Sequence, residues 1–407
     1  MGLVYAVWEL TLRCDLACGH CGSRAGKARG HELSTDEALD LVRQLAALGT
    51  NEVTLIGGEA YLRDDWTTIA RAIRDAGMHC TVTTGGRGLT AERAHAAADA
   101  GVESVSVSLD GLEATHDRQR GVPGAFRAAR AAIGHLHDAG IDVAVNTQIN
   151  RLSFPELEPL LALLVEERVH AWQVQLTVAM GRAVENAAWL LQPYDLLDVM
   201  PRLAELAERA RARGVRFWPG NNIGYFGPHE ATLRGGEGSY RDGGCGAGNT
   251  TLGIEADGAI KGCPSLPTAD YSGGSIRERP LAELWQHARE LRFTRDRTVE
   301  ELWGYCRECY YADVCRGGCT WTAHVLFGQR GNNPYCHHRA LELARRGLRE
   351  RLVPTAPAPG LPFDYGRFAI VVEPLDATRE EIHERPLDPM PGLQPPHPAG
   401  RRQLPIL

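Results

Sequence analysis

Six short runs of β-branched and apolar residues recur in the first 180 residues, and segments with helical periodicity lie between them. In the segment at 34–48, Ser34 and Glu37 form a capping box at the start and Gly49 follows the end. Strands that alternate with helices predict right-handed crossovers and one parallel sheet. The six runs lie at 5–12, 52–56, 80–84, 103–109, 142–148 and 171–178.

Six units are too few to close an eight-stranded barrel, so the pattern predicts an α/β fold with a partial (β/α)6 barrel over residues 1–184. In such barrels the chemistry takes place at the carboxyl ends of the strands. Residues 185–244 are expected to form a connector, with a long helix near 194–213 and a short strand at 215–218. A small, irregular α+β domain rich in cysteine and glycine is expected at 245–352, closed by a helix at about 338–352.

The last segment, 353–407, holds 12 of the 23 prolines. This composition predicts a tail that is largely extended or disordered until a partner binds it.

Composition excludes several classes of protein. The chain has 407 residues, 43% of them hydrophobic, a net charge of −7 and no block of Lys and Arg, which argues against a nucleic-acid partner. It has no apolar run long enough to span a membrane and no signal peptide, so we expect a cytoplasmic protein. An odd number of cysteines, 11, without a signal peptide argues against a framework of disulfides.

Three of these cysteines, Cys14, Cys18 and Cys21, follow the first strand directly and so belong to the rim of the barrel. Their spacing can place three thiolates on one face of a [4Fe–4S] cube, which leaves one iron without a protein ligand. A zinc site is the alternative, but zinc favours paired C-x₂-C motifs or an added histidine. His20 stands between two of the cysteines and is expected to point away from their metal.

The C-x₃-C-x₂-C motif, followed one strand later by Gly57, Gly58 and Glu59, resembles the radical S-adenosylmethionine (SAM) superfamily. The resemblance implies that the open iron binds the amino and carboxylate groups of SAM. It also implies one-electron cleavage of SAM to a 5′-deoxyadenosyl radical that abstracts hydrogen from a substrate.

The same resemblance implies a set of SAM contacts. Gly57, Gly58 and Glu59 correspond to the edge that binds the amino group, and the segments around Asn146 and Arg182 to those near the carboxylate and adenine. The ribose is expected at Ser108 and Asp110. His20 occupies a position that is commonly aromatic and packs near the adenine, and Ala60 replaces a common proline.

Seven further cysteines between 245 and 336 match the SPASM pattern, a domain that usually carries two auxiliary [4Fe–4S] clusters. The resemblance implies that one cluster has four cysteine ligands and that the other has three. We interpret the missing ligand as an open or exchangeable site; a non-cysteine ligand or a smaller cluster is the alternative. A zinc-ribbon scaffold is the alternative for all ten motif cysteines. The four-cysteine group is Cys306, Cys309, Cys315 and Cys336, and the three-cysteine group is Cys245, Cys263 and Cys319.

Two features outside these motifs have competing interpretations. Cys80 begins a strand and belongs to neither pattern, so it is interpreted as a small core residue, with a redox role as the alternative. His116, Asp117 and Arg120 follow the ribose segment. They belong either to a substrate contact or to a capped, solvated helix start.

The full SPASM pattern resembles that of enzymes that modify peptides or protein side chains, such as maturases of ribosomally made peptides. The implied reaction is an oxidative change such as a crosslink or a backbone excision, and an external donor of the flavodoxin or ferredoxin type supplies electrons. The first strand starts within the first few residues, so a leader-peptide-binding domain is not expected there. A separate recognition protein, or leader binding by the tail, is expected instead. The rivals are sulfatase-type oxidation of Ser or Cys, oxidation of a sugar alcohol, and a non-catalytic iron–sulfur scaffold.

Overall fold

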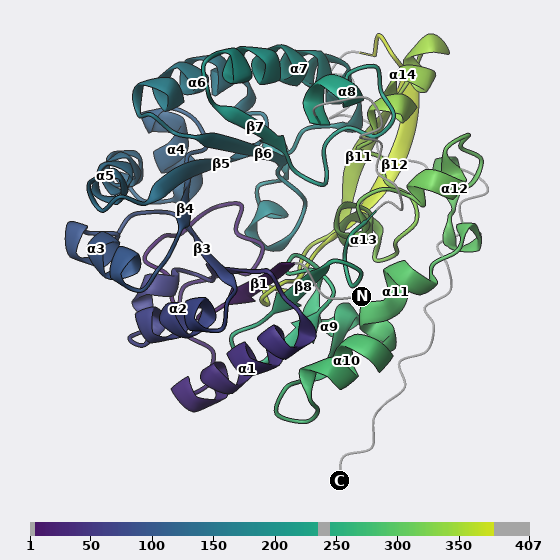
Figure 1. Cartoon of the computed structure of the whole chain (residues 1–407). Helices are drawn as coiled ribbons and strands as arrows, with labels where there is room; N and C mark the ends of the chain where they lie inside the picture. Colours follow the sequence, from purple (N-terminus) through teal and green to yellow (C-terminus); the bar gives the residue numbers. More distant parts are fainter. Residues whose placement is uncertain (1–4, 235–244, 378–407) are drawn as a thin grey trace.

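The computed structural model describes residues 5–234 and 245–377 (Figure 1). Ten strands form one open sheet in the order β10-β9-β8-β1-β2-β3-β4-β5-β6-β7, and the neighbours from β8 through β1 to β7 are all parallel. The predicted fold class, a partial barrel of parallel strands, is confirmed. The six strands predicted from sequence are β1 (Tyr5–Glu9), β2 (Glu52–Ile56), β3 (His79–Thr84), β4 (Ser104–Ser108), β5 (Asp142–Ile149) and β6 (Ala171–Leu176).

The sheet extends beyond these six strands at both edges. The strand predicted inside the connector is β7 (Arg216–Pro219), which pairs with β6, so the connector contributes to the sheet. At the other edge β8 (Thr251–Ile254), from the cysteine-rich domain, pairs in parallel with β1. The predicted hairpin continues from β8 to β9 (Ala259–Lys261) and on to β10 (Ser272–Ser275). The two domains therefore share one sheet.

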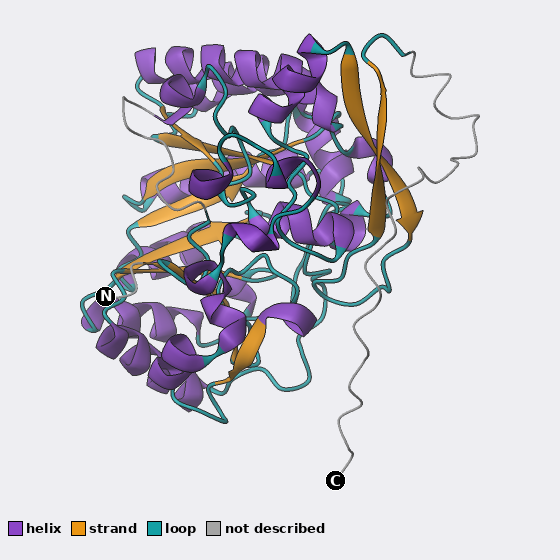
Figure 2. Ribbon diagram, turned by 90° about the vertical axis from the view of Figure 1, so that its right-hand side faces the viewer, coloured by secondary structure: helices purple, strands orange, loops and turns teal. Residues whose placement is uncertain are grey.

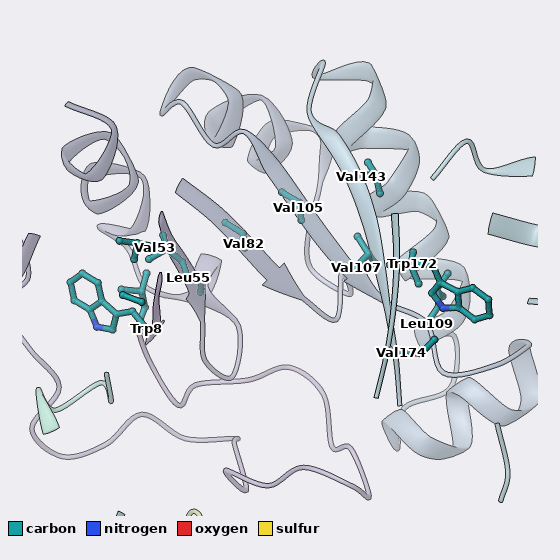
Figure 3. Close-up of a cluster of buried hydrophobic side chains, with 14 of the residues drawn as sticks. Trp8, Val53, Leu55, Val82, Val105, Val107, Leu109, Val143, Trp172 and Val174 are labelled. Atoms are coloured by element: carbon teal, nitrogen blue, oxygen red, sulfur yellow. The ribbon is translucent and has the colours of Figure 1, made fainter. Parts of the chain in front are cut away.

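Helices cover the outer face of the barrel sheet (Figure 1). Alternate strand residues such as Val53, Val105 and Trp172 point outward into this helical layer and are fully buried, because a strand turns successive side chains to opposite faces (Figure 3). Cys80 lies in the same core, as the core interpretation predicts. The helices of this layer are α1 (Thr35–Leu48), α2 (Trp66–Asp75), α3 (Ala91–Asp99), α4 (Glu113–Arg120), α5 (Ala125–Asp138), α6 (Leu157–Glu166) and α7 (Leu196–Ala212).

Short helices and loops make up most of the cysteine-rich part. They are α8 (Glu230–Arg234), α9 (Thr268–Tyr271), α10 (Leu281–His287), α11 (Arg289–Asp296), α12 (Ala312–Cys315), α13 (Thr320–Phe327) and α14 (His337–Arg345).

The predicted end of the chain is wrong in one respect. The closing helix, expected at about 338–352, ends at Arg345, and β11 (Leu348–Ala356) follows it and pairs with β12 (Arg367–Pro374) as an antiparallel hairpin (Figure 2). The expected boundary at 353 therefore falls inside a strand. The proline content of this segment led to the wrong boundary. Proline is tolerated on the edges of a two-stranded ribbon and in its loop, so it does not exclude a hairpin. The rest of the predicted tail, 378–407, lies outside the described residues.

A buried cluster of charges joins the barrel to the cysteine-rich domain. Arg29 pairs with Glu9 of β1 at 3.0 Å and with Glu255 at 3.1 Å, and Glu255 also pairs with Lys261 at 2.6 Å. Lys261 is fully buried and donates a second hydrogen bond to the carbonyl of Leu266. The charges balance within the cluster, which is the condition for burying them.

Replacing Lys261 by methionine is expected to lower the free energy of unfolding by about 3 kcal/mol, because Glu255 loses a buried partner. Anaerobic urea unfolding of the reconstituted protein measures this loss of stability. The double variant with Glu255→Gln should lose less than the sum of the two single changes. The exposed pair Arg292–Asp296 provides the control, since Arg292→Met should leave the free energy of unfolding nearly unchanged. Equal losses for the buried and exposed variants would contradict this account.

Candidate active site

The loop after β1 holds Cys14, Cys18 and Cys21 together, and contacts from distant elements fix it. The amide of Cys14 donates to Gly26 O at 3.2 Å, and the Arg182 guanidinium donates to Cys18 O at 2.9 Å. Burial, then the Glu59 carboxyl and the other two thiols, raise the pKa of Cys14 to about 12. The thiols thus lie close enough to influence one another, and a bound metal would favour their ionised form.

The strand end at Gly57, Gly58 and Glu59 lies directly against this loop. Gly58 N donates to Thr11 O and Glu59 N donates to Arg13 O, both at 2.8 Å. A Cβ on Gly58 would lie 2.8 Å from Cys14 Cβ and still closer to the Arg13 carbonyl. Only glycine permits this approach, as the predicted SAM edge requires.

Glu59 points back toward the cysteine loop. Its carboxylate accepts hydrogen bonds from Thr84 Oγ1 at 2.5 Å and from Gly85 N at 2.7 Å. Burial raises its pKa to about 7. Ligand atoms of Cys14, Asp15 and Glu59 lie within 4.8 Å of one another, so a carboxylate stands beside the position of the predicted iron.

The predicted ribose segment is more enclosed than the sequence indicates. Asp110 is fully buried, and its carboxylate pairs with Arg120 at 2.6 Å, lies 3.5 Å from His20 and accepts from Gln148 N at 2.8 Å. Ser108 is also buried. Among the predicted SAM contacts, His20, Gly57 and Asn146 line the central cavity, whereas the side chains of Asp110 and Arg182 bond within the wall.

The helix after Asp110 starts in solvent, because residues 112–114 are exposed, and its later residues turn into the protein without lining the cavity. His116 and Arg120 are buried, and the Arg120 guanidinium lies 3.7 Å from Cys18 Sγ. Asp117 accepts from Gly124 N and Phe126 N and so binds the start of α5. Arg120 is therefore the residue of this segment that contacts the cysteine loop, and its carbonyl also accepts from Ala17 N at 3.1 Å.

A cavity of about 1430 Å³ fills the barrel between its inner face and the cysteine-rich domain. On one side Asn146 and Gln148 of β5 stand beside Gln173 and Gln175 of β6, in matched register. We call these four side chains the amide wall. The wall was missed at the sequence level, although the alternation in "AWQVQL" is the signal that could have revealed it.

The SPASM cysteines separate into the two predicted groups. Cys306, Cys309, Cys315 and Cys336 line one small pocket, whereas Cys245, Cys263 and Cys319 line the large cavity. Burial, then Cys245 and Cys319, raise the pKa of Cys263 to about 12. The group that is one cysteine short is thus the group that faces the cavity.

Each cysteine group has a buried arginine beside it with unsatisfied donors. Arg120 lies at Cys18, Arg297 interacts electrostatically with Cys245 and Cys315, and Arg339 with Cys306 and Cys336. At least one side-chain nitrogen of each, Nε in all three, is buried without a hydrogen-bond partner among the described residues. Arg120 and Arg339 each pair with one carboxylate, Asp110 and Glu350, and their remaining buried donors, like those of Arg297, are left for a further anion. Thiolate-ligated iron–sulfur clusters are anionic, so the residues present fit these groups.

Arg297→Leu is expected to make an auxiliary cluster harder to reduce, because a buried positive charge near its sulfur ligands is lost. A shift on the order of 60 mV toward negative potential corresponds to a tenfold change in a one-electron equilibrium. A redox titration followed by electron paramagnetic resonance measures it. The exposed Arg289 supplies the control, since Arg289→Leu should leave every potential in place. An unchanged or more positive reduction potential in Arg297→Leu would contradict the role of Arg297 in stabilising the reduced cluster.

Comparison with known proteins agrees with this geometry. The family model of the radical SAM superfamily matches residues 8–157, and that of the SPASM iron–sulfur cluster-binding domain matches residues 245–310. The AdoMet-dependent heme synthase of Methanosarcina barkeri is 32% identical over 342 residues, which cover 82% of this chain and 95% of the relative. The PqqA peptide cyclase of Ruegeria pomeroyi is 30% identical over 351 residues, which cover 84% of this chain and 90% of that relative. The chain belongs to the radical SAM superfamily and carries a SPASM domain.

A solved structure supports the fold. Streptococcus suis SuiB bound to S-adenosylmethionine superposes with a TM-score of 0.64 at 17% identity, covering 82% of this chain and 76% of SuiB. From the family models and the curated relatives, the protein is a radical SAM enzyme whose cofactors are S-adenosylmethionine and iron–sulfur clusters. No helix in the described part of the chain has the length and hydropathy needed to cross a membrane.

Proposed function

We propose that this enzyme oxidatively modifies a ribosomally made peptide. Cys14, Cys18 and Cys21 would hold the SAM-binding cluster, which would donate the electron that cleaves SAM, and the 5′-deoxyadenosyl radical formed from SAM would remove hydrogen from the substrate. The chain's own residues hold the peptide against that site and exclude water from it. The described cysteines form no disulfide, which is consistent with a reducing, cytoplasmic setting.

The amide wall is the observation that carries this proposal. The side chains of Gln148, Gln173 and Gln175 have no hydrogen-bond partner among the described residues, and Asn146 Oδ1 is buried without one. Each amide offers both donors and an acceptor. A peptide backbone presents the same neutral groups at regular intervals, so it can satisfy several of these amides at once.

A tetrapyrrole is the second candidate, favoured by the similarity to the heme synthase. Its carboxylates would need cationic partners. No lysine lines the described part of the cavity, and the three arginines there have other contacts. Arg234 pairs with Glu230 at 2.6 Å, Arg211 donates to carbonyls of α8, and Arg216 lies over the Trp218 ring. The absence of lysine from the described lining and the existing contacts of its three arginines, together with the similarity to the PqqA peptide cyclase, favour the peptide.

We assign the auxiliary cluster with an exchangeable iron site to the three-cysteine group at the cavity. A cluster in this position would either accept an electron from the substrate or bind the substrate directly. We assign reduction of the iron–sulfur clusters to an external electron donor of the flavodoxin or ferredoxin type. We assign recognition of the rest of the precursor peptide to a separate leader-binding protein or to the segment 378–407. Mössbauer spectra of reconstituted protein test the iron site; auxiliary irons that all have cysteine-like ligands would contradict it.

Release of 5′-deoxyadenosine by the reduced, reconstituted enzyme distinguishes the two substrates. Peptides encoded by short reading frames next to the gene are compared with Fe-coproporphyrin III, the tetrapyrrole in the name of another relative, the Fe-coproporphyrin III synthase of Methanosarcina barkeri, which is 27% identical over 356 residues. Stimulation by one peptide and not by the porphyrin is expected. The reverse result would replace the peptide with a tetrapyrrole. The variant Gln173→Leu with Gln175→Leu should weaken peptide stimulation about 30-fold, because each of the two amides loses hydrogen bonds that contribute roughly 1 kcal/mol, about 2 kcal/mol together.

A further inference from the structure

The loop of the C-terminal hairpin, residues 357–366, docks beside the cysteine loop of the barrel. Phe363 N donates to Gly22 O at 3.1 Å, and Gly181 N donates to Asp364 O at 2.9 Å. The Asp364 carboxylate accepts from Arg24 Nε at 2.8 Å. A segment far from the SAM site in sequence is therefore held next to it by contacts on both sides.

Phe363 has an unusual conformation in this loop. Its φ is 57°, in the left-handed region that aromatic residues rarely adopt. The surrounding contacts hold it there, and strain of this kind is typical of functional positions. The Lys261 ammonium lies 3.7 Å from the ring centroid and Arg29 lies 5.8 Å from it, so cations of the domain junction fix the ring.

The ring of Phe363 lines the cavity together with Met180 and Trp321. These side chains pack with Val178, and Trp321 Nε1 lies 3.0 Å from Met180 Sδ. Met180 packs against Gly22, beside Cys21. We call Met180, Trp321 and Phe363 the apolar corner; like the amide wall, it borders the central cavity near the predicted radical site.

We propose that the apolar corner is a side-chain pocket that selects an aromatic or aliphatic residue of the substrate peptide, and that Phe363 is its specificity-determining residue. The proposal rests on the proposed peptide function and names the residue class that function acts on. The amide wall binds the backbone while the corner takes the side chain. A charged side chain is disfavoured there, because Met180 and Phe363 offer it no strong hydrogen bond and the cations at the Phe363 ring, Lys261 and Arg29, already pair with Glu255 and Glu9.

Blocked tripeptides acetyl-Gly-X-Gly-amide, with X as Phe, Leu, Lys or Glu, test the pocket. Their dissociation constants are measured by equilibrium dialysis against reconstituted enzyme with SAM. Wild type should prefer Phe and Leu over Glu and Lys by roughly tenfold or more. Phe363→Gly should reduce this preference to about twofold while relieving the left-handed backbone, so folding is preserved. Phe363→Leu should retain part of the preference.

Leu361→Ala is the matched control, because Leu361 lies in the same loop, is exposed and does not line the cavity. It should bind all four tripeptides as wild type does. Binding without preference for X, or a preference that survives in Phe363→Gly, would overturn the pocket and leave the peptide function intact. No tripeptide binding, with tight binding of Fe-coproporphyrin III in the same assay, would overturn both.

Discussion

Replacing Cys18 by alanine is expected to abolish SAM cleavage and to remove about four irons per chain, the content of one [4Fe–4S] cluster. Cys18 is buried in the loop that Arg120 and Arg182 hold in place, and no nearby cysteine can take over its position. The auxiliary cysteines lie in separate pockets, so their clusters should survive. Iron and sulfide analysis and assay of 5′-deoxyadenosine measure the two effects.

Cys80→Ala is the matched control for that experiment. Cys80 is a fully buried core residue, so its loss should cost on the order of 1 kcal/mol of stability and leave iron content unchanged. Full SAM cleavage by Cys18→Ala, or an equal loss of iron from Cys80→Ala, would contradict the assignment of the first three cysteines.

Gly58→Ala is expected to produce the second large effect. The added methyl would lie 2.8 Å from Cys14 Cβ and collide with the Arg13 carbonyl, so the cysteine loop and the SAM edge must separate. A misplacement of about 1 Å can cost roughly 100-fold in rate. SAM affinity, measured by equilibrium dialysis, and the rate of SAM cleavage should therefore both fall, with iron partly retained.

Gly30→Ala provides the comparison, because a Cβ at Gly30 meets no atom within 4 Å. It should behave as wild type in both assays. If Gly58→Ala bound SAM normally, the predicted contact between the Gly57–Glu59 edge and the amino group would be wrong.

The sequence predicts the barrel well, because its signals are local. Strand alternation, the capping box at Ser34 and the stop at Gly49 are each set by neighbours in the chain, and the structure reproduces them. The C-terminal hairpin could not be predicted in this way. β11 and β12 are stabilised by pairing with each other and by packing against α13 and α14, and proline content conceals that pairing.

The residues of the candidate site also divide into those that local sequence signals predict and those that long-range contacts determine. The cysteine motifs bring their residues together through spacing alone, whereas the roles of Arg120 and Arg297 depend on contacts across the fold. Phe363 is the extreme case, since nothing around it in sequence indicates that it lines the cavity beside Met180. Long-range contacts, which no local pattern records, determine the substrate side of the site.

The most direct test of the central claim is a single turnover with a deuterated peptide. Reduced, reconstituted enzyme is mixed with SAM and a peptide encoded beside the gene, labelled at its apolar residues, and the 5′-deoxyadenosine is analysed by mass spectrometry. We expect deuterium in 5′-deoxyadenosine and an oxidised peptide. Unlabelled 5′-deoxyadenosine with every such peptide, together with label transferred from deuterated Fe-coproporphyrin III, would contradict it.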